Sequence, residues 1–314
     1  MATSGNILYT TTRDDIITEA LELIGVLGTG QTPDSADVTS CSRTLNMMIK
    51  SWQADGLALH TIKQTYLFLV PGQQEYSLHA ATSDHWTSEL STTTLSVGAA
   101  LGAASVTVTE VTGITDNDYI GVYLDTGVMH WTQVNGAPAG SVVSLDVVLP
   151  AAASSGAVVY HYTSKAGYPV KIVNAFHHEF NSTDLEVDLI NRAEYWGLGD
   201  KASSGTVLQV YFDDLGQSPK LRVWPTASNG RNYLILFVQR VLENFDAAVD
   251  NPDFPQEWFL PLAYNLALLV APKFSIPSSQ MELILMKATE WYAKVKEADD
   301  EVYTRISIRP DMRF

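Results

Sequence analysis

The densest cluster of residues that could do chemistry is His177-His178-Glu179. Imidazole and carboxylate side chains bind metal ions and transfer protons, so the cluster could belong to a metal or acid–base site. The surrounding pattern predicts extended backbone, however, and adjacent side chains of a strand point to opposite faces of the sheet. The two histidines would then not share a metal ion, and an ordinary surface strand or loop is the favoured interpretation.

Two acidic groups could bind calcium or catalyse hydrolysis. Residues 116–118, Asp-Asn-Asp, resemble the start of a calcium loop but lack its glycine and its distal glutamate, so a turn is predicted. Asp184, Glu186 and Asp188 alternate with the period of a strand, which predicts a solvated acidic face. A carboxylate pair for glycoside hydrolysis could be drawn from many positions, so the sequence does not single one out.

Sequence motifs of the common enzyme classes are absent. There is no phosphate-binding loop, no Gly-x-Ser-x-Gly, no His-Glu-x-x-His and no dinucleotide-binding fingerprint. The single cysteine, Cys41, cannot form an intramolecular disulfide or a cysteine zinc site, and its place on an apolar stripe indicates burial. We therefore expect no cofactor, no metal ion and no enzymatic activity.

Any candidate site must be positioned by helices at the two ends of the chain and by strands between them. Apolar residues recur with helical spacing over residues 14–52 and again over 254–295, and a one-sided apolar helix must bury that face. The simplest partners are the two ends themselves, which predicts one helical domain from residues 1–60 and 252–301. In the last helix the expected buried stripe is Met281, Ile284, Leu285, Ala288, Trp291, Tyr292 and Val295. Thr12, with Asp15 three residues on, is expected to cap the start of the first helix.

The middle of the chain is predicted to be β structure in two parts. Alternating apolar runs over residues 61–84 and 164–251 predict an antiparallel β framework domain. Between them the composition shifts to Thr, Ser, Ala, Gly and Val, and short, evenly spaced runs over 85–163 predict an inserted small β barrel or sandwich. We expect this module to be separable, and the expected fold class is α+β.

The chain is strongly acidic, and its charge is unevenly distributed. Lys and Arg number 19 and Asp and Glu 35, which gives a formal net charge of -16. Between Lys63 and Lys165 there is no Lys or Arg, so this stretch cannot neutralise phosphates and nucleic-acid binding there is not expected. Solubility alone could explain the acidity, and a surface past which DNA moves without sticking is the sharper interpretation. Neither a signal peptide nor a membrane-spanning segment is predicted.

Four segments outside the insert carry a resemblance to a known family. They are residues 14–25 (DDIITEALELIG), 45–56 (LNMMIKSWQADG), 192–197 (RAEYWG) and 251–258 (NPDFPQEW). Together they resemble the head-to-tail adaptors of tailed bacteriophages, which are also called packaged-DNA stabilisation proteins or tail accessory factors. The insert at 85–163 resembles a β module seen in several phage structural proteins.

The resemblance implies a structural role in the virion. Such adaptors form a ring, usually of twelve copies, below the portal protein after the genome has been packaged. They extend the DNA channel and provide the attachment platform for the tail nozzle or tail tube. The chain would then be assembled in the host cytoplasm and reside at the head-to-tail interface, where genomic DNA passes without sequence-specific binding and no membrane is involved.

The last residues, 302–314, form a basic segment on an acidic protein. Alternating β-prone residues and three arginines predict an extended tail, and the resemblance implies that such a tail grips the portal. We expect it to become ordered only against that partner, with its arginines paired to carboxylates. The residues expected at this interface are Arg305, Ile306, Ile308, Arg309, Pro310, Met312, Arg313 and Phe314.

Two other functions remain open from the sequence. A virion-associated cell-wall hydrolase could use carboxylates that no motif identifies. A carbohydrate-binding tail or fibre protein is suggested by Trp86, Trp131 and the threonine-rich insert, because exposed aromatic rings stack on sugars. Ring assembly separates the adaptor from the fibre protein, and release of peptidoglycan fragments would identify the hydrolase.

Overall fold

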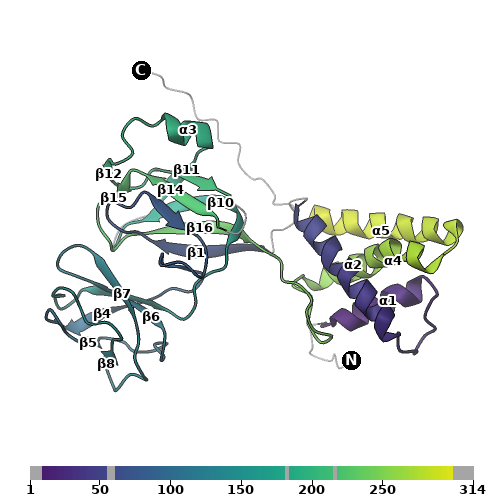
Figure 1. The fold of residues 1–314 in the computed structure, drawn as a ribbon, viewed down its shortest axis with the longest axis horizontal. Coiled ribbons are helices and arrows are strands. Elements are labelled where there is room, and N and C mark those ends of the chain that lie inside the picture. The colour runs from purple at the N-terminus through teal and green to yellow at the C-terminus, as the bar shows by residue number, and fades with distance from the viewer. Residues whose placement is uncertain (1–8, 55–60, 181–183, 215–217, 300–314) are drawn as a thin grey trace, which may run out of the picture. The chain divides into compact units, whose positions relative to one another are not determined.

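The computed structural model describes residues 9–54, 61–180, 184–214 and 218–299. It divides the chain into two compact units, one formed by Met1–Thr61 with Leu242–Phe314 and the other by Ile62–Val241. The first unit is helical and the second is built of strands, so the expected α+β class is confirmed (Figure 1). Residues 242–251, which were expected in the β framework, belong to the helical unit.

Four helices build the helical unit. They are α1 (Arg13–Leu23), α2 (Ser35–Ala54), α4 (Phe259–Val270) and α5 (Ser278–Asp299), with short 3-10 turns at η2 (Gln256–Trp258) and η3 (Ala271–Phe274). The start of α1 has the predicted capping box, in which Thr12 accepts from the Asp15 amide and the Asp15 side chain accepts from the Thr12 amide. Two of the free amides at the helix start are thereby satisfied, which fixes where α1 begins.

One apolar core runs through all four helices, although about two hundred residues separate the two pairs in sequence. Its centre is an aromatic cluster: the Trp52 ring centroid lies 6.5 Å from Phe254, 5.8 Å from Trp258 and 5.0 Å from Tyr292. Cys41 is fully buried in the same core, as its place on the stripe predicted. The remaining large buried members include Ile17, Leu21, Leu45, Ile49, Leu262, Leu266, Ile284 and Val295.

The predicted buried stripe of the last helix is too wide. Ile284, Ala288 and Val295 are buried, but Leu285 is 49% exposed. Trp291 is only partly buried, and the Lys294 ammonium lies 4.4 Å from its ring centroid. Only one residue of each adjacent apolar pair can face the core, because neighbouring positions on a helix are 100° apart.

The β unit contains an eight-stranded sheet in the order β2-β14-β13-β11-β10-β16-β1-β3. Its long central strands β1, β10 and β16 are antiparallel neighbours, with Leu67 opposite Leu234 in the register of β1 and β16. The strands are β1 (Ile62–Phe68), β2 (Glu75–Ser77), β3 (Trp86–Thr87), β10 (Pro169–His178), β11 (Asp184–Leu189), β13 (Gln209–Asp213), β14 (Lys220–Trp224) and β16 (Tyr233–Arg240).

The expectation of a purely antiparallel framework is wrong at two pairs, because β12 (Ser204–Gly205) and β15 (Thr226–Ala227) are parallel as well as β11 and β13. A parallel pair needs a long crossover, and the connection between β11 and β13 holds the short helix α3 (Arg192–Gly197) and β12. Strand β12 in turn pairs with β15 as a separate two-stranded sheet.

A second sheet of six strands forms the insert, in the order β7-β6-β9-β4-β5-β8. The sheet curls so that its two end strands, β7 and β8, approach each other. Next to them, Val134 and Leu145 form an antiparallel β-bridge, and the Asn135 amide donates a hydrogen bond to the Ser144 carbonyl at 3.0 Å. The strands are β4 (Ser91–Val97), β5 (Ser105–Val108), β6 (Tyr119–Tyr123), β7 (Met129–Gln133), β8 (Val142–Ser144) and β9 (Val158–Tyr162).

An aromatic seam joins the insert to the eight-stranded sheet. Phe68 of β1 is 4.6 Å from Trp131 and 5.2 Å from Tyr160 between ring centroids, and Tyr160 is 5.7 Å from Tyr233 of β16. Trp86, which the sequence assigned to the insert, lies instead in β3 and pairs with β1. The insert therefore shares a core with its host sheet. Among the described residues no helix is long and apolar enough to cross a membrane.

Candidate functional site

The histidine pair occupies a strand, as predicted, but His177 is buried and not at the surface. His177 and His178 end β10, with His177 fully buried against Asn232 at 3.1 Å and His178 bonded to Asp184 at 2.6 Å. Glu179 accepts a hydrogen bond from the Thr206 hydroxyl at 2.9 Å. Within the part of the chain that is described, no group of three His, Cys, Asp or Glu side chains could hold a metal ion.

The two acidic groups also have local structural roles. Residues 116–118 form the predicted turn, in which the Asp116 carboxylate accepts the Gly136 amide at 2.6 Å and Asp118 accepts the Thr115 amide at 2.6 Å. In β11, Asp184, Glu186 and Asp188 are all exposed, which confirms the solvated acidic face.

The two tryptophans that suggested carbohydrate binding are not displayed to solvent as a sugar platform. Trp86 is fully buried, and the Trp131 ring stacks on His85 at 4.2 Å within the aromatic seam. Trp131 is half-buried, and Gly121 approaches its ring closely as well as His85. The eight tail residues expected at a partner interface, Arg305 to Phe314, lie outside the described residues.

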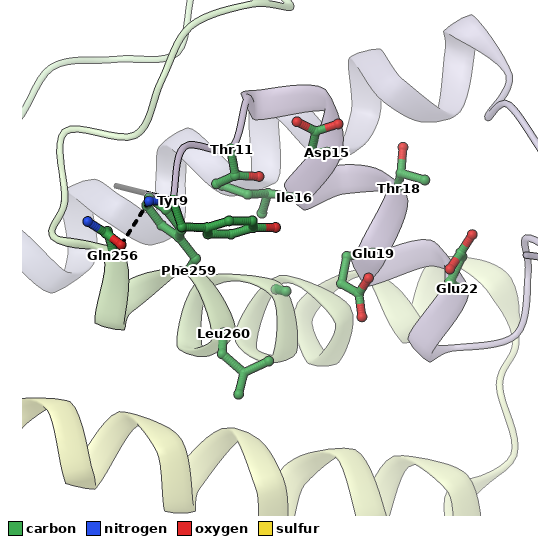
Figure 2. Close-up of a pocket in the computed structure, with 11 residues that line it drawn as sticks. Tyr9, Thr11, Asp15, Ile16, Thr18, Glu19, Glu22, Gln256, Phe259 and Leu260 are labelled. Atoms are coloured by element: carbon green, nitrogen blue, oxygen red, sulfur yellow. Dashed lines mark hydrogen bonds between the residues drawn. The ribbon is translucent and has the colours of Figure 1, made fainter. Parts of the chain in front are cut away.

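Sequence reasoning missed a groove in the helical unit, between α1 and α4. At its centre is Tyr9, whose side chain is 67% exposed even though its ring is 5.9 Å from that of Phe259. The Tyr9 amide donates to the Gln256 side chain at 3.0 Å, and the Arg13 amide donates to the Asp250 carbonyl at 2.9 Å. These two bonds hold the start of α1 and the residue segment before it against the segment before α4, and Figure 2 shows the bond between Tyr9 and Gln256.

Two hollows lie on either side of Tyr9 and together make up what we call the Tyr9 groove. The first has a volume of about 530 Å³ and the second of about 380 Å³. Side chains from both chain ends line them, so the groove exists only because the two pairs of helices share one core. The lining residues are Tyr9, Thr10, Thr11, Asp15, Ile16, Thr18, Glu19, Glu22, Asn251, Pro252, Phe254, Pro255, Gln256, Glu257, Phe259, Leu260 and Ala263.

Every charged side chain in that lining is acidic. Asp15, Glu19 and Glu22 follow one another along α1 (Figure 2). Glu257 belongs to the lining of the second hollow. Hydrogen bonds from the Thr12 backbone and side chain lower the pKa of Asp15, so its carboxylate is ionised at neutral pH. Among the described residues, no Lys or Arg pairs with Glu19.

The chemistry of the Tyr9 groove is that of recognition. An apolar floor at Ile16, Phe259 and Ala263 lies beside carboxylates that form no ion pair with a described Lys or Arg, which suits a segment that carries both apolar and cationic side chains. A sequence signal for the groove was present in Tyr9 and in the acidic side of α1. It could not be recognised, because a groove depends on how distant helices meet.

Comparisons with known proteins identify no relative of the whole chain. No protein-family model matches it, and no curated protein matches it. Among solved structures, a part resembles the gp54 tailspike of Acinetobacter baumannii bacteriophage AP22, which was determined in complex with an A. baumannii capsular saccharide. The likeness has a TM-score of 0.21 and 15% identity, and it covers 23% of this chain and 14% of the tailspike chain. The chain therefore spans only a small part of the tailspike's length, and a TM-score this low carries no argument about fold or function.

Proposed function

We propose that the protein is a structural head-to-tail adaptor of a phage virion. Twelve copies form a ring below the portal, extend the DNA channel and provide the platform on which the tail nozzle or tail tube assembles. The proposal rests on the sequence resemblance of the helical segments and of the framework, together with one observation on the surface of the helical unit.

That observation is the exposed apolar surface of α4 and α5. Leu269 is 48% exposed, Leu283 59%, Leu285 49% and Met286 55%, in a unit whose core is already complete without them. Single exposed apolar residues are common on monomers, but several on one helix pair favour a surface that other subunits cover. This supports a subunit of a larger assembly.

The charge of the chain fits a ring that surrounds DNA. Twelve copies carry 12 × 16 = 192 formal negative charges. DNA has the same sign, so an acidic channel repels the duplex from its wall and lets it slide without binding.

Native mass spectrometry of the purified protein, alone and with isolated portal rings, tests the proposal. The expected species is a dodecamer of 12 × 34.4 kDa = 413 kDa. The substitutions Leu283→Asp and Met286→Asp should dissociate it, because each places a charge in an apolar contact. Thr39→Asp, at an exposed position of α2 outside this surface, is the matched control. A protein that stays monomeric with portal present would contradict the proposal.

A further inference from the structure

We propose that the Tyr9 groove is the docking site of the chain's own C-terminal segment, residues 302–314, which folds back onto the helical unit. The inference goes beyond the adaptor function and does not depend on ring formation. Three features carry the inference. Both the groove and the segment have apolar side chains, their charges are opposite, and the segment starts close enough to reach the groove.

The apolar parts match in kind. The groove presents the exposed Tyr9 ring, the partly buried Phe259 ring and the 39% exposed side chain of Leu260. An exposed aromatic held in place by a backbone hydrogen bond is a suitable anchor, since little further entropy is lost when a ligand covers it. The segment brings four large apolar side chains, which are Ile306, Ile308, Met312 and Phe314.

The charges are complementary. The groove is lined by four carboxylates and by no cationic side chain. The segment carries Arg305, Arg309 and Arg313 against the single acid Asp311, in a chain whose formal net charge is -16. Arginine is the cation best suited to carboxylates, because its planar guanidinium donates two parallel hydrogen bonds.

The segment starts close enough to reach the groove. Near the end of α5, the Tyr292 ring centroid is 6.3 Å from that of Trp258, and Trp258 follows Gln256 and Glu257 of the groove lining. Arg305 is six residues beyond Asp299, the end of α5, and an extended chain of that length spans about 20 Å. The chain's own segment also has the advantage of a high effective concentration, so it outcompetes the segment of another copy at moderate protein concentration.

Other occupants fit the groove less well. Residues 1–8 precede Tyr9 directly, but their sequence has no charged side chain and could not pair with Glu19 or Glu22. The segment of a second copy has the right chemistry and lacks the short connection. If the portal also takes this segment, as the adaptor resemblance implies, the segment must leave the groove first.

Disulfide trapping in the full-length chain tests the docking. The variant Thr18→Cys/Ser307→Cys places one thiol in the groove lining and one in the segment. Thr289→Cys/Ser307→Cys is the matched control, because Thr18 and Thr289 both donate to the carbonyl four residues earlier at 2.8 Å and only Thr18 lines the groove. In dilute protein we expect at least about fivefold more intramolecular disulfide in the first variant, measured by intact mass and mobility without reductant. Equal yields would overturn the proposal, as would disulfides that form only between chains.

A charge swap identifies the groove acids as the recognition element. In the Thr18→Cys/Ser307→Cys chain, Glu19→Lys and Arg309→Glu should each lower the disulfide yield about fivefold, and the two together should restore it. Glu282→Lys makes the same charge change on exposed α5 outside the groove and should leave the yield unaltered. Equal losses from Glu19→Lys and Glu282→Lys would overturn the assignment. Ring assembly is measured separately by mass, so failure of the docking is distinguishable from failure of the adaptor function.

Discussion

Burial favours the neutral form of three histidines in the β unit, His85, His161 and His177. His85 stacks on Trp131 and forms a hydrogen bond with the Tyr162 hydroxyl at 2.6 Å. Burial is the main cause that lowers the pKa of His85 to about 3, and the nearby Lys165 charge adds to it. Burial also lowers the pKa values of His161 and His177. In the unfolded chain a histidine has a pKa of about 6.5. Below that pH the unfolded state therefore binds more protons than the folded state, in which these histidines stay neutral. The stabilisation is therefore complete above pH 6.5 and is lost as the pH falls.

We expect the free energy of unfolding of the β unit to decrease between about pH 7 and pH 5. Each histidine that stays neutral in the folded state should contribute up to about 1.4 kcal/mol per pH unit below its unfolded pKa. Urea unfolding at a series of pH values, followed by intrinsic fluorescence, measures this slope. His85→Gln should make it shallower than in the parent. A stability independent of pH in this window would contradict this, because it would mean that the histidines bind protons equally in the folded and unfolded states.

Two tryptophans of the helical unit should differ sharply in their contribution to stability. Trp52 is 8% exposed at the centre of the aromatic cluster, so Trp52→Ala should cost about 3–5 kcal/mol. Trp291 lies outside that core under Lys294, and Trp291→Ala should cost less than about 1.5 kcal/mol. Chemical denaturation of both variants provides the comparison. Equal losses would mean that the shared core is not centred on Trp52.

At the scale of single residues, sequence reasoning succeeded where the signal was local. The Thr12 capping box and the burial of Cys41 both follow from neighbours in the chain. It failed at Leu285 and Trp291, because residue type alone does not decide which of two adjacent apolar residues faces the core. Tyr9 was not identified, since its exposure depends on how α1 meets α4.

At the scale of elements, the insert is less independent than its composition suggested. The chain enters and leaves it at one place, where the Thr87 hydroxyl donates to the Ser164 carbonyl at 2.7 Å. That favours an inserted module. Yet Phe68, Tyr233 and Ile235 of the host sheet are buried in the aromatic seam, at 1%, 8% and 9% exposure.

Deletion of residues 89–163, with a short Gly/Ser bridge, should therefore destabilise the remaining sheet. Uncovering each large side chain costs about 1.5–3 kcal/mol, and the new apolar surface should favour aggregation. Adding Phe68→Thr and Ile235→Thr to the deletion should recover soluble protein. The measurements are the soluble fraction and the urea midpoint of each variant. A simple deletion as soluble and stable as the parent would show that the seam contributes little.

The positions of strands were easier to predict from the sequence than which strands pair with each other. Alternating apolar residues marked β1, β10, β14 and β16 correctly, because period-two patterning is a local signal. The parallel pairing of β11 with β13, and the place of Trp86 in the larger sheet, were not predicted. Both depend on contacts between segments distant in sequence, which the burial pattern of one strand does not encode.

At the scale of the whole molecule, we propose that copies of the chain assemble into an adaptor ring. Three features support this assembly: the acidic charge, the shared core of the two chain ends, and the exposed apolar residues of α4 and α5. None of them depends on the docked C-terminal segment. The ring and the segment can thus be tested apart.

The most direct measurement is electron microscopy of the purified protein bound to isolated portal rings, averaged without imposed symmetry. The account predicts a ring with twelvefold symmetry, coaxial with the portal and open along its axis. Trimers, or single chains scattered on the portal surface, would contradict it.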